Sequence, residues 1–149
     1  MRAIIQRCHS VMTRNADPRG IMLATRWRVE YTKSCIPVVK PLFWVGRSRE
    51  EVRAFPVEAR HKAGDDLRRV QHGEVPSDWR PMTDVGAGVC EIRIHGVVEH
   101  RVLYVAKFPE AVYVLHAFAK RSRRTPRLHL DVARARWRGL VRLRAERPL

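Results

Sequence analysis

The chain has 149 residues and a formal net charge of +15, with a sequence pI near 11.2. That length allows one ordinary hydrophobic core, and the charge makes a polyanion, nucleic acid before membrane, the first partner to consider. Three cysteines without paired spacing argue against a zinc knuckle or a disulfide framework, and no apolar run resembles a membrane span or a secretory signal. We therefore expect a soluble cytoplasmic protein with no membrane partner.

The positive charge is concentrated at the two ends of the chain. Residues 1–36 carry seven Lys or Arg against two Asp or Glu, residues 120–149 carry eleven against two, and residues 37–119 are almost neutral. Residues 1–36 show no sustained helix or strand period. Three interpretations of this segment stay open: a basic arm, an ordered cap on the domain, or upstream sequence that precedes a later start. We therefore divide the chain into a basic N-terminal extension, 1–36, and a domain, 37–149.

The pattern becomes regular after Pro37. Residues 38–45 predict a strand with Trp44 as its aromatic anchor. Residues 48–51 form a capping-box pattern, in which the Ser48 hydroxyl would accept a hydrogen bond from a backbone amide and Glu51 would reach back. A short helix should follow.

A second helix is expected over residues 56–71, because Pro56 suits a first helical turn. Gly64 in its middle predicts a close approach of this helix to a sheet. Gly73 suits the end of the helix, and residues 72–88, rich in Pro and Gly, predict a loop. The apolar stripe of the helix is Val57, Ala63, Leu67 and Val70.

Three alternating runs follow within residues 89–119, and short turns separate them, so they predict an antiparallel three-stranded meander. Because side chains alternate across a pleat, Glu91 and Arg93 should share a face that also carries Arg101 and Lys107. The third run is apolar on both faces except for His116, which predicts the covered central strand. It ends in the basic residues 120–124, so cations should converge on one side of the sheet.

A last helix should begin at Thr125 and Pro126. Its apolar stripe is Leu130, Ala133, Trp137, Leu140 and Val141, and a second stripe is Arg134, Arg138 and Arg142. The predicted order is β-α-α-β-β-β-α. This is an α+β fold with a small antiparallel-rich four-stranded sheet, two N-terminal helices packed on one face and a C-terminal helix. The other face should be open, with Arg93 and Arg101 facing solvent.

Several segments carry a resemblance to a known family. They are PLFWVG at 41–46, Phe55 with Pro56, GAGVCEIR at 86–93, RVLYVAKF at 101–108, and AVYVLHAF at 111–118 followed by the basic run. Over residues 38–143 the chain resembles the RelE/ParE toxin superfamily, in particular its HigB-like, phage-derived branch. The resemblance implies a RelE-like fold and a metal-independent, ribosome-dependent endoribonuclease that cuts mRNA (an mRNA interferase) and needs no cofactor. It also implies neutralisation by a helix-turn-helix antitoxin, as in type II toxin-antitoxin systems.

The resemblance suggests roles for individual residues. Arg101 would bind the scissile phosphate, and Arg93 would help to bind it. Lys120 or Arg121 would stabilise the leaving oxygen. Beside these roles, the residues themselves suggest further RNA contacts: Arg123, Arg124 and Lys107 are basic candidates, and Trp79, in the loop, is a candidate for stacking on bases. Arg134 and Arg138 either touch the RNA backbone or only solvate the last helix.

Two residues have competing interpretations. Glu91 is either a general base or a partner of Arg93, and we favour the partner. His116 is either an acid-base group or a hydrogen-bonded core residue, and we favour the core residue. No cluster of Asp, Glu, His or Cys has ligand spacing for a metal.

Two other functions stay open. A ParE-like chain of this fold would inhibit DNA gyrase, and a degenerate prophage remnant would bind nucleic acid without catalysis. The convergence of Arg93, Arg101 and Lys120 or Arg121 favours the ribonuclease over the gyrase inhibitor, and the remnant stays open as a second alternative.

Overall fold

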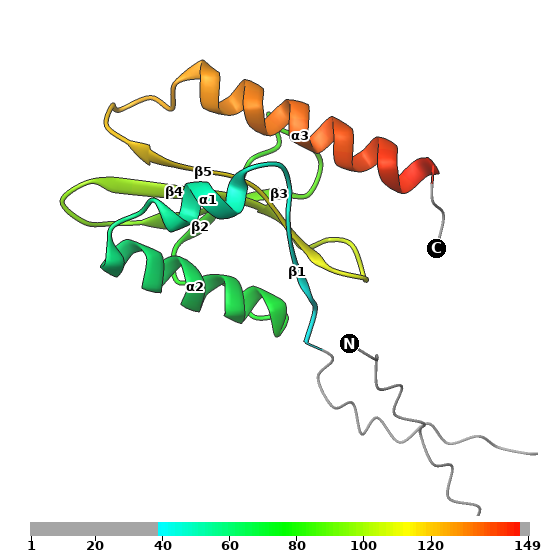
Figure 1. Cartoon of the computed structure of the whole chain (residues 1–149), viewed down its shortest axis with the longest axis horizontal. Helices are drawn as coiled ribbons and strands as arrows, with labels where there is room; N and C mark the ends of the chain where they lie inside the picture. The colour runs from blue at the N-terminus through cyan, green and yellow to red at the C-terminus, as the bar shows by residue number, and fades with distance from the viewer. Residues whose placement is uncertain (1–38, 147–149) are drawn as a thin grey trace, which may run out of the picture. The chain divides into compact units, whose positions relative to one another are not determined.

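A computed structural model describes residues 39–146, so the N-terminal extension predicted at 1–36 lies outside the described residues. A mixed five-stranded sheet has α2 and α3 on opposite sides (Figure 1). None of the helices within 39–146 combines the length and apolar character needed to cross a bilayer. The elements in chain order are β1 (Leu42–Trp44), α1 (Ser48–Arg53), α2 (Val57–Gln71), β2 (Trp79–Pro81), β3 (Val89–Ile94), β4 (Glu99–Val105), β5 (Val112–Lys120) and α3 (Arg127–Glu146).

The α+β class and the antiparallel meander of β3, β4 and β5 are confirmed, but the sheet has one strand more than predicted. The sheet order is β1-β5-β4-β3-β2. The prediction of a plain loop over 72–88 is wrong, because β2 pairs antiparallel with β3 at this edge. β2 has only three residues, all exposed, and includes Pro81, so it carries no alternation that local reasoning can detect.

The central strand is β4, so the prediction that β5 holds the middle is wrong. β5 is nevertheless paired on both sides, because β1 runs parallel to it with Leu42 opposite Val112 and Trp44 opposite Val114. This long-range pairing adds a strand to the free edge of the meander and displaces the centre by one position.

The first hydrophobic core lies between the sheet and helices α1 and α2. Ala63, Leu67 and Val70 are buried there as predicted, but Val57 is 60% exposed and does not belong to the stripe. The expected close approach at Gly64 is also wrong, since a Cβ at this position would meet nothing within 4 Å. The helix ends as predicted, because Gly73 has φ +79° and follows the last helical turn.

The second core lies on the opposite face, where Ala133, Trp137 and Leu140 of α3 pack on apolar residues of β4 and β5. The prediction of an open second face is therefore wrong. β4 and β5 are apolar on both faces over most of their length, so both faces must be covered to keep them from water. Val141 of the expected α3 stripe is 42% exposed.

The capping box at 48–51 is also wrong. Arg47 holds the cap position of α1 and makes no side-chain cap bond. The Ser48 hydroxyl is buried and donates to the Val114 carbonyl at 2.9 Å, while Glu51 extends toward β5. Contacts with β5 have replaced the local bonds that the sequence pattern predicts.

Candidate functional site

Polar side chains from three neighbouring strands share one end of the sheet, on the face that α3 partly covers. In the register, Arg93 lies opposite Arg101, Arg101 lies opposite Phe118, and Glu99 lies opposite Lys120. Directly opposed residues have Cβ atoms about 5 Å apart. We call Glu91, Arg93, Glu99, Arg101, Phe118 and Lys120 the polar sheet face. The structure thus brings Arg93, Arg101 and Lys120 together.

Arg101 is buried, with 6% of its surface exposed, which corrects the prediction that it faces solvent. Its Nη1 donates to Glu99 Oε2 and to the His100 carbonyl, both at 2.9 Å. Its Nε lies 3.6 Å from Oε1 of Glu91, a fully buried carboxylate. Several fixed acceptors therefore hold this guanidinium in one orientation.

Glu91 does not hold Arg93, so that prediction is wrong. Its Oε2 accepts a hydrogen bond from Arg80 Nε at 2.6 Å, and Arg80 belongs to the β2 strand that the sequence did not reveal. Arg93 donates instead to Asp78 Oδ1 at 2.9 Å and 2.6 Å. Arg80 and Asp78, which bind Glu91 and Arg93, both lie in or next to β2.

A histidine links the carboxylates at this edge. His95 lies 2.6 Å from Asp78 Oδ2 through Nε2 and 3.0 Å from Glu99 Oε1 through Nδ1. These two hydrogen bonds, the stronger one to Asp78, raise the pKa of His95. Hydrogen bonds therefore link Arg93 to Arg101 through Asp78, His95 and Glu99 in turn.

The basic loop, residues 121–124 between β5 and α3, differs in having no acidic partner in the described part of the chain. Lys120 Nζ donates to the Arg123 carbonyl at 2.9 Å. Arg121, Arg123 and Arg124 are exposed. Within residues 39–146 no salt bridge involves Lys120 or this loop, so its charges are available to a polyanion.

Glu51, His116, His129 and Arg136 form a cluster beside the polar sheet face; His116 is buried and the other three are partly buried, and we call them the buried cluster. Glu51 Oε2 accepts from His116 Nδ1 at 2.7 Å and from the Ala117 amide at 3.0 Å. Arg136 binds both oxygens of Glu51, with Nη2 at 2.8 Å from Oε1 and Nη1 at 3.0 Å from Oε2. A bulge that leaves Leu115 without a register partner sets the position of His116.

The hydrogen bonds keep Glu51 ionised. Its burial acts to raise the pKa, but the bonds from His116, Arg136 and the Ala117 amide outweigh burial and lower the pKa to about 2. His116 Nε2 lies 2.9 Å from His129 Nδ1. Burial and the neighbouring His116 lower the pKa of His129.

His129 connects the buried cluster to the polar sheet face. Its ring stacks on Phe118, with centroids 4.1 Å apart and planes inclined by 7°, and Phe118 lies opposite Arg101. The sequence marks only His116 of this cluster as a candidate site residue. Its local pattern places Glu51 in a helix cap, and no local pattern marks His129 or Arg136.

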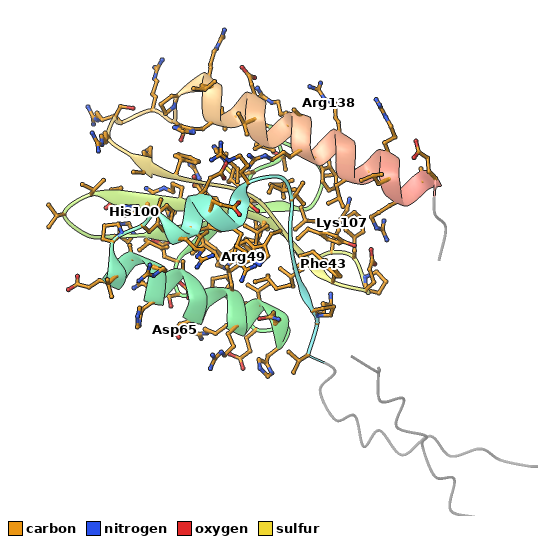
Figure 2. The ribbon with its side chains drawn as sticks, viewed as in Figure 1. Phe43, Arg49, Asp65, His100, Lys107 and Arg138 are labelled. Carbon is orange, nitrogen blue, oxygen red and sulfur yellow. The ribbon has the colours of Figure 1, made fainter. Side chains whose placement is uncertain are left out.

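Three sequence-named cations lie away from the polar sheet face. Figure 2 shows Lys107 and His100, the neighbour of Arg101, at opposite ends of the sheet. Lys107 lies 4.8 Å from the centroid of the Trp137 ring, so it packs against α3. Arg134 Nε donates to the Asp84 carbonyl at 2.9 Å, while Arg138 is exposed on the outer side of α3.

The stacking candidate Trp79 also lies elsewhere. It is 40% exposed and pairs with Ile92, whose side chain belongs to the first core. Trp79 therefore lies on the α2 side of the sheet, opposite the polar sheet face. Lys107, Trp79, Arg134 and Arg138 therefore do not belong to the polar sheet face, and their predicted contacts with RNA stay a prediction.

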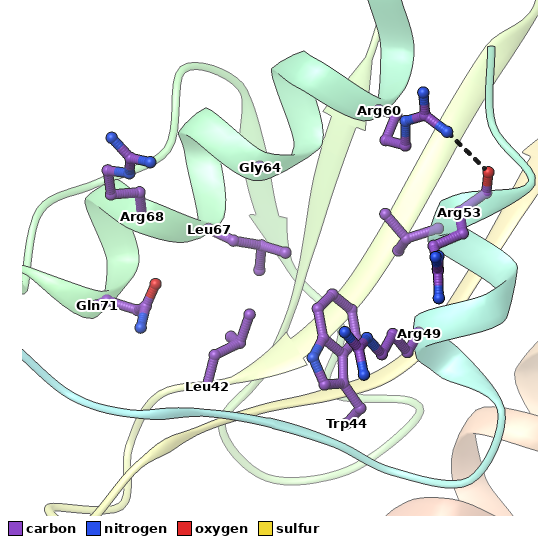
Figure 3. Close-up of a pocket in the computed structure, with 10 residues that line it drawn as sticks. Leu42, Trp44, Arg49, Arg53, Arg60, Gly64, Leu67, Arg68 and Gln71 are labelled. Atoms are coloured by element: carbon purple, nitrogen blue, oxygen red, sulfur yellow. Dashed lines mark hydrogen bonds between the residues drawn. The ribbon is translucent and has the colours of Figure 1, made fainter. Parts of the chain in front are cut away.

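A separate arginine-lined groove of about 390 Å³ lies between β1, α1 and α2 (Figure 3). Leu42, Trp44, Val52 and Leu67 supply its apolar lining, and Arg49, Arg53, Arg60 and Arg68 its charges. Arg60 Nη1 donates to the Arg53 carbonyl at 3.3 Å. In the described part of the chain none of these four arginines forms a salt bridge. The groove therefore combines apolar surface with uncompensated positive charge.

The fold and the polar sheet face define a small basic α+β protein whose sheet presents arginines beside a cationic loop. The family model described as phage derived protein Gp49-like (DUF891) matches residues 50–138, more than half of the chain. The chain therefore belongs to this phage-derived family, which is RelE-like and toxin-like. No curated protein matches the chain. The matched range includes both the polar sheet face and the buried cluster.

Proposed function

We propose that the chain is the toxin of a type II toxin-antitoxin system, of the HigB-like branch, and that it cuts mRNA on the ribosome. The observation that carries this proposal is the placement of Arg93, Arg101 and Lys120 in register on one sheet face, beside a basic loop that has no acidic partner among residues 39–146. Membership of the RelE-like Gp49 family supports it.

The reaction we propose needs electrostatic stabilisation and proton transfer. The 2′-oxygen of one nucleotide attacks the adjacent phosphorus, the bond to the 5′-oxygen breaks, and the products carry 2′,3′-cyclic phosphate and 5′-hydroxyl ends. Negative charge develops on the phosphate oxygens in the transition state. Donors that are already oriented stabilise this charge most effectively.

Arg101 suits this task because its guanidinium is buried and already held by Glu99 and the His100 carbonyl. Its planar set of donors matches phosphate oxygens. Arg93 is more exposed, at 37% of its side chain, and Asp78 steadies it as the second cation. Lys120 or Arg121 would stabilise the leaving oxygen.

We also propose that an acidic segment of an antitoxin docks in the arginine-lined groove. Charge complementarity favours an acidic partner, and the apolar lining favours a polypeptide with aliphatic anchors over RNA. A second copy of this chain, also at +15, would be repelled. A partner held there would keep the toxin out of the ribosomal A site by its bulk.

The docking proposal is tested with the product of a neighbouring helix-turn-helix gene. Arg53→Glu combined with Arg60→Glu should weaken its binding at least tenfold, whereas Arg138→Glu, on the outer side of α3, should not. Equal affinities of the wild type, the double variant and Arg138→Glu for this partner would mean that the partner binds outside the groove. If the double variant instead loses affinity for RNA and keeps its affinity for the partner, the groove is an RNA-binding site.

Induced expression of the full chain tests the function as a whole. Translation should stop while DNA synthesis continues at first. Early loss of DNA synthesis with translation intact would favour the gyrase inhibitor, and loss of neither would favour the non-catalytic remnant.

A matched pair of variants then tests the assigned face. Arg101→Lys keeps the charge but removes the planar donors, so single-turnover cleavage on programmed ribosomes should fall about 100-fold. Arg138→Lys is the control, because Arg138 is exposed on the outer side of α3, away from the polar sheet face. Equal cleavage rates would mean that the active face lies elsewhere.

A further inference from the structure

The hydrogen bonds of the buried cluster determine where its protons lie. Glu51 is ionised and can only accept, so His116 Nδ1 must carry the hydrogen that spans the 2.7 Å to Glu51. In neutral His116 the other nitrogen, Nε2, is then an acceptor. His129 Nδ1, at 2.9 Å, must donate to it. This assignment follows from the network and leaves the lone pair of His129 on Nε2.

The free nitrogen of His129 lies near the proposed phosphate site. Nε2 has no hydrogen-bond partner within residues 39–146, and the side chain is partly exposed at the first turn of α3. The His129 ring covers Phe118, which is the cross-strand neighbour of Arg101. Phe118 is therefore the residue that lies between the His129 ring and Arg101, which we propose binds the phosphate.

Arg136 and Glu51 contact the Nδ1 side of His116. Arg136 Nη1 lies 3.3 Å from His116 Nδ1, and Glu51 accepts hydrogen bonds from both residues. His116 Nε2 faces His129 Nδ1, so Nε2 of His129 is the one ring nitrogen of the two histidines without a partner among residues 39–146, and a substrate proton can reach it.

We propose that His129 is the general base of the cleavage reaction, with Glu51 and His116 as positioning residues that fix its tautomer. The proposal rests on the function proposed above. As the 2′-oxygen forms its bond to phosphorus, its proton passes to His129 Nε2. The phosphorus bond to the 5′-oxygen breaks with its electron pair, and that oxygen takes up a proton from protonated His129 or from water. One proton moves in total, and no redox partner is needed.

The decisive variant is His129→Asn. The Asn amide can replace Nδ1–H as the donor to His116, so the buried network is kept while the base is removed. Single-turnover cleavage on programmed ribosomes should fall about 100-fold or more. The rise in rate with increasing pH, which reports deprotonation of the base, should disappear; in the wild type it should lie on the acidic side of the ordinary histidine range, because burial and the neighbouring His116 lower the pKa of His129. His61→Asn is the control, because His61 is exposed on α2.

Glu51→Gln tests the positioning role. Glu51 raises the proton affinity of His129, so without its charge the acidic limb of the pH-rate profile should move to lower pH as the maximal rate falls. A residue that only stabilised the fold would change the folded fraction and leave the limb in place. Imidazole should partly restore cleavage to His129→Ala but not to Glu51→Gln.

The outcomes separate the two proposals. A wild-type chain that leaves mRNA intact on ribosomes would overturn the proposed function and this role with it. A wild-type chain that cleaves, with His129→Asn cleaving at the same rate and with the same pH profile, would overturn the general base alone. Thermal unfolding of each variant shows whether the protein assayed is folded.

Discussion

Replacing Glu51 with glutamine tests how much the ionised Glu51 carboxylate contributes to the free energy of unfolding. The carboxylate accepts bonds from His116, Arg136 and the Ala117 amide, and only 21% of its side chain is exposed. Its pKa falls from 4.5 to about 2 despite its burial. That difference corresponds to about 3 kcal/mol of stability, at 1.36 kcal/mol for each pH unit.

The pH dependence of this stability has a definite sign. The folded-state pKa of Glu51 is lowered, so its contribution is fully present above pH 4.5 and is lost as the pH falls toward about 2. The glutamine side chain of the variant does not titrate. The difference in unfolding free energy between the wild type and Glu51→Gln should therefore be about 3 kcal/mol at pH 7 and shrink steadily below pH 4.5.

Equilibrium urea unfolding, followed by tryptophan fluorescence at several pH values, measures this difference. Glu50→Gln is the matched control, because Glu50 is the neighbouring residue on α1, is exposed, and should change stability by less than ~0.5 kcal/mol. A difference that stays constant from pH 7 down to about pH 3 would refute the argument. So would an equal loss in Glu50→Gln.

Three further predictions concern other parts of the molecule. Arg101→Ala should lower the unfolding free energy by about 3 kcal/mol in urea, because it removes a buried partner of Glu91; a loss under ~0.5 kcal/mol would contradict the buried ion pair. Gly86→Ala should cost about 1–3 kcal/mol, since the new Cβ would overlap the indole of Trp137, whereas Gly64→Ala, which meets nothing, should gain about 0.5–1 kcal/mol by calorimetry. Cleavage should survive EDTA and leave cyclic phosphate ends, because within residues 39–146 no group of three His, Cys, Asp or Glu side chains is arranged to hold a metal ion; 5′-phosphate products would indicate a different mechanism.

Local spacing in the amino-acid sequence was sufficient to predict the α+β class, the meander of β3 to β5 and the main helices. Each of these depends on the spacing of apolar residues within one segment, and burial of one face then follows from that spacing. The same alternation showed that Arg93 and Arg101 share a face. The crowding of positive charge after β5 was equally visible, because it requires no knowledge of contacts.

The pairing of the charged side chains was decided only by the tertiary structure, through contacts between segments that are distant in the chain. Glu91 pairs with Arg80 because β2, a three-residue strand without a local pattern, pairs with β3. Arg101 is buried on the face of β4 that α3 partly covers. Glu51 does not cap α1 as predicted. Parallel pairing of β1 with β5 brings α1 beside His116, 65 positions later in the chain, and Glu51 bonds to that histidine instead. Local propensities are worth less than about 1 kcal/mol each, whereas a buried carboxylate without a partner costs several, so the buried charges follow the partners that the fold supplies.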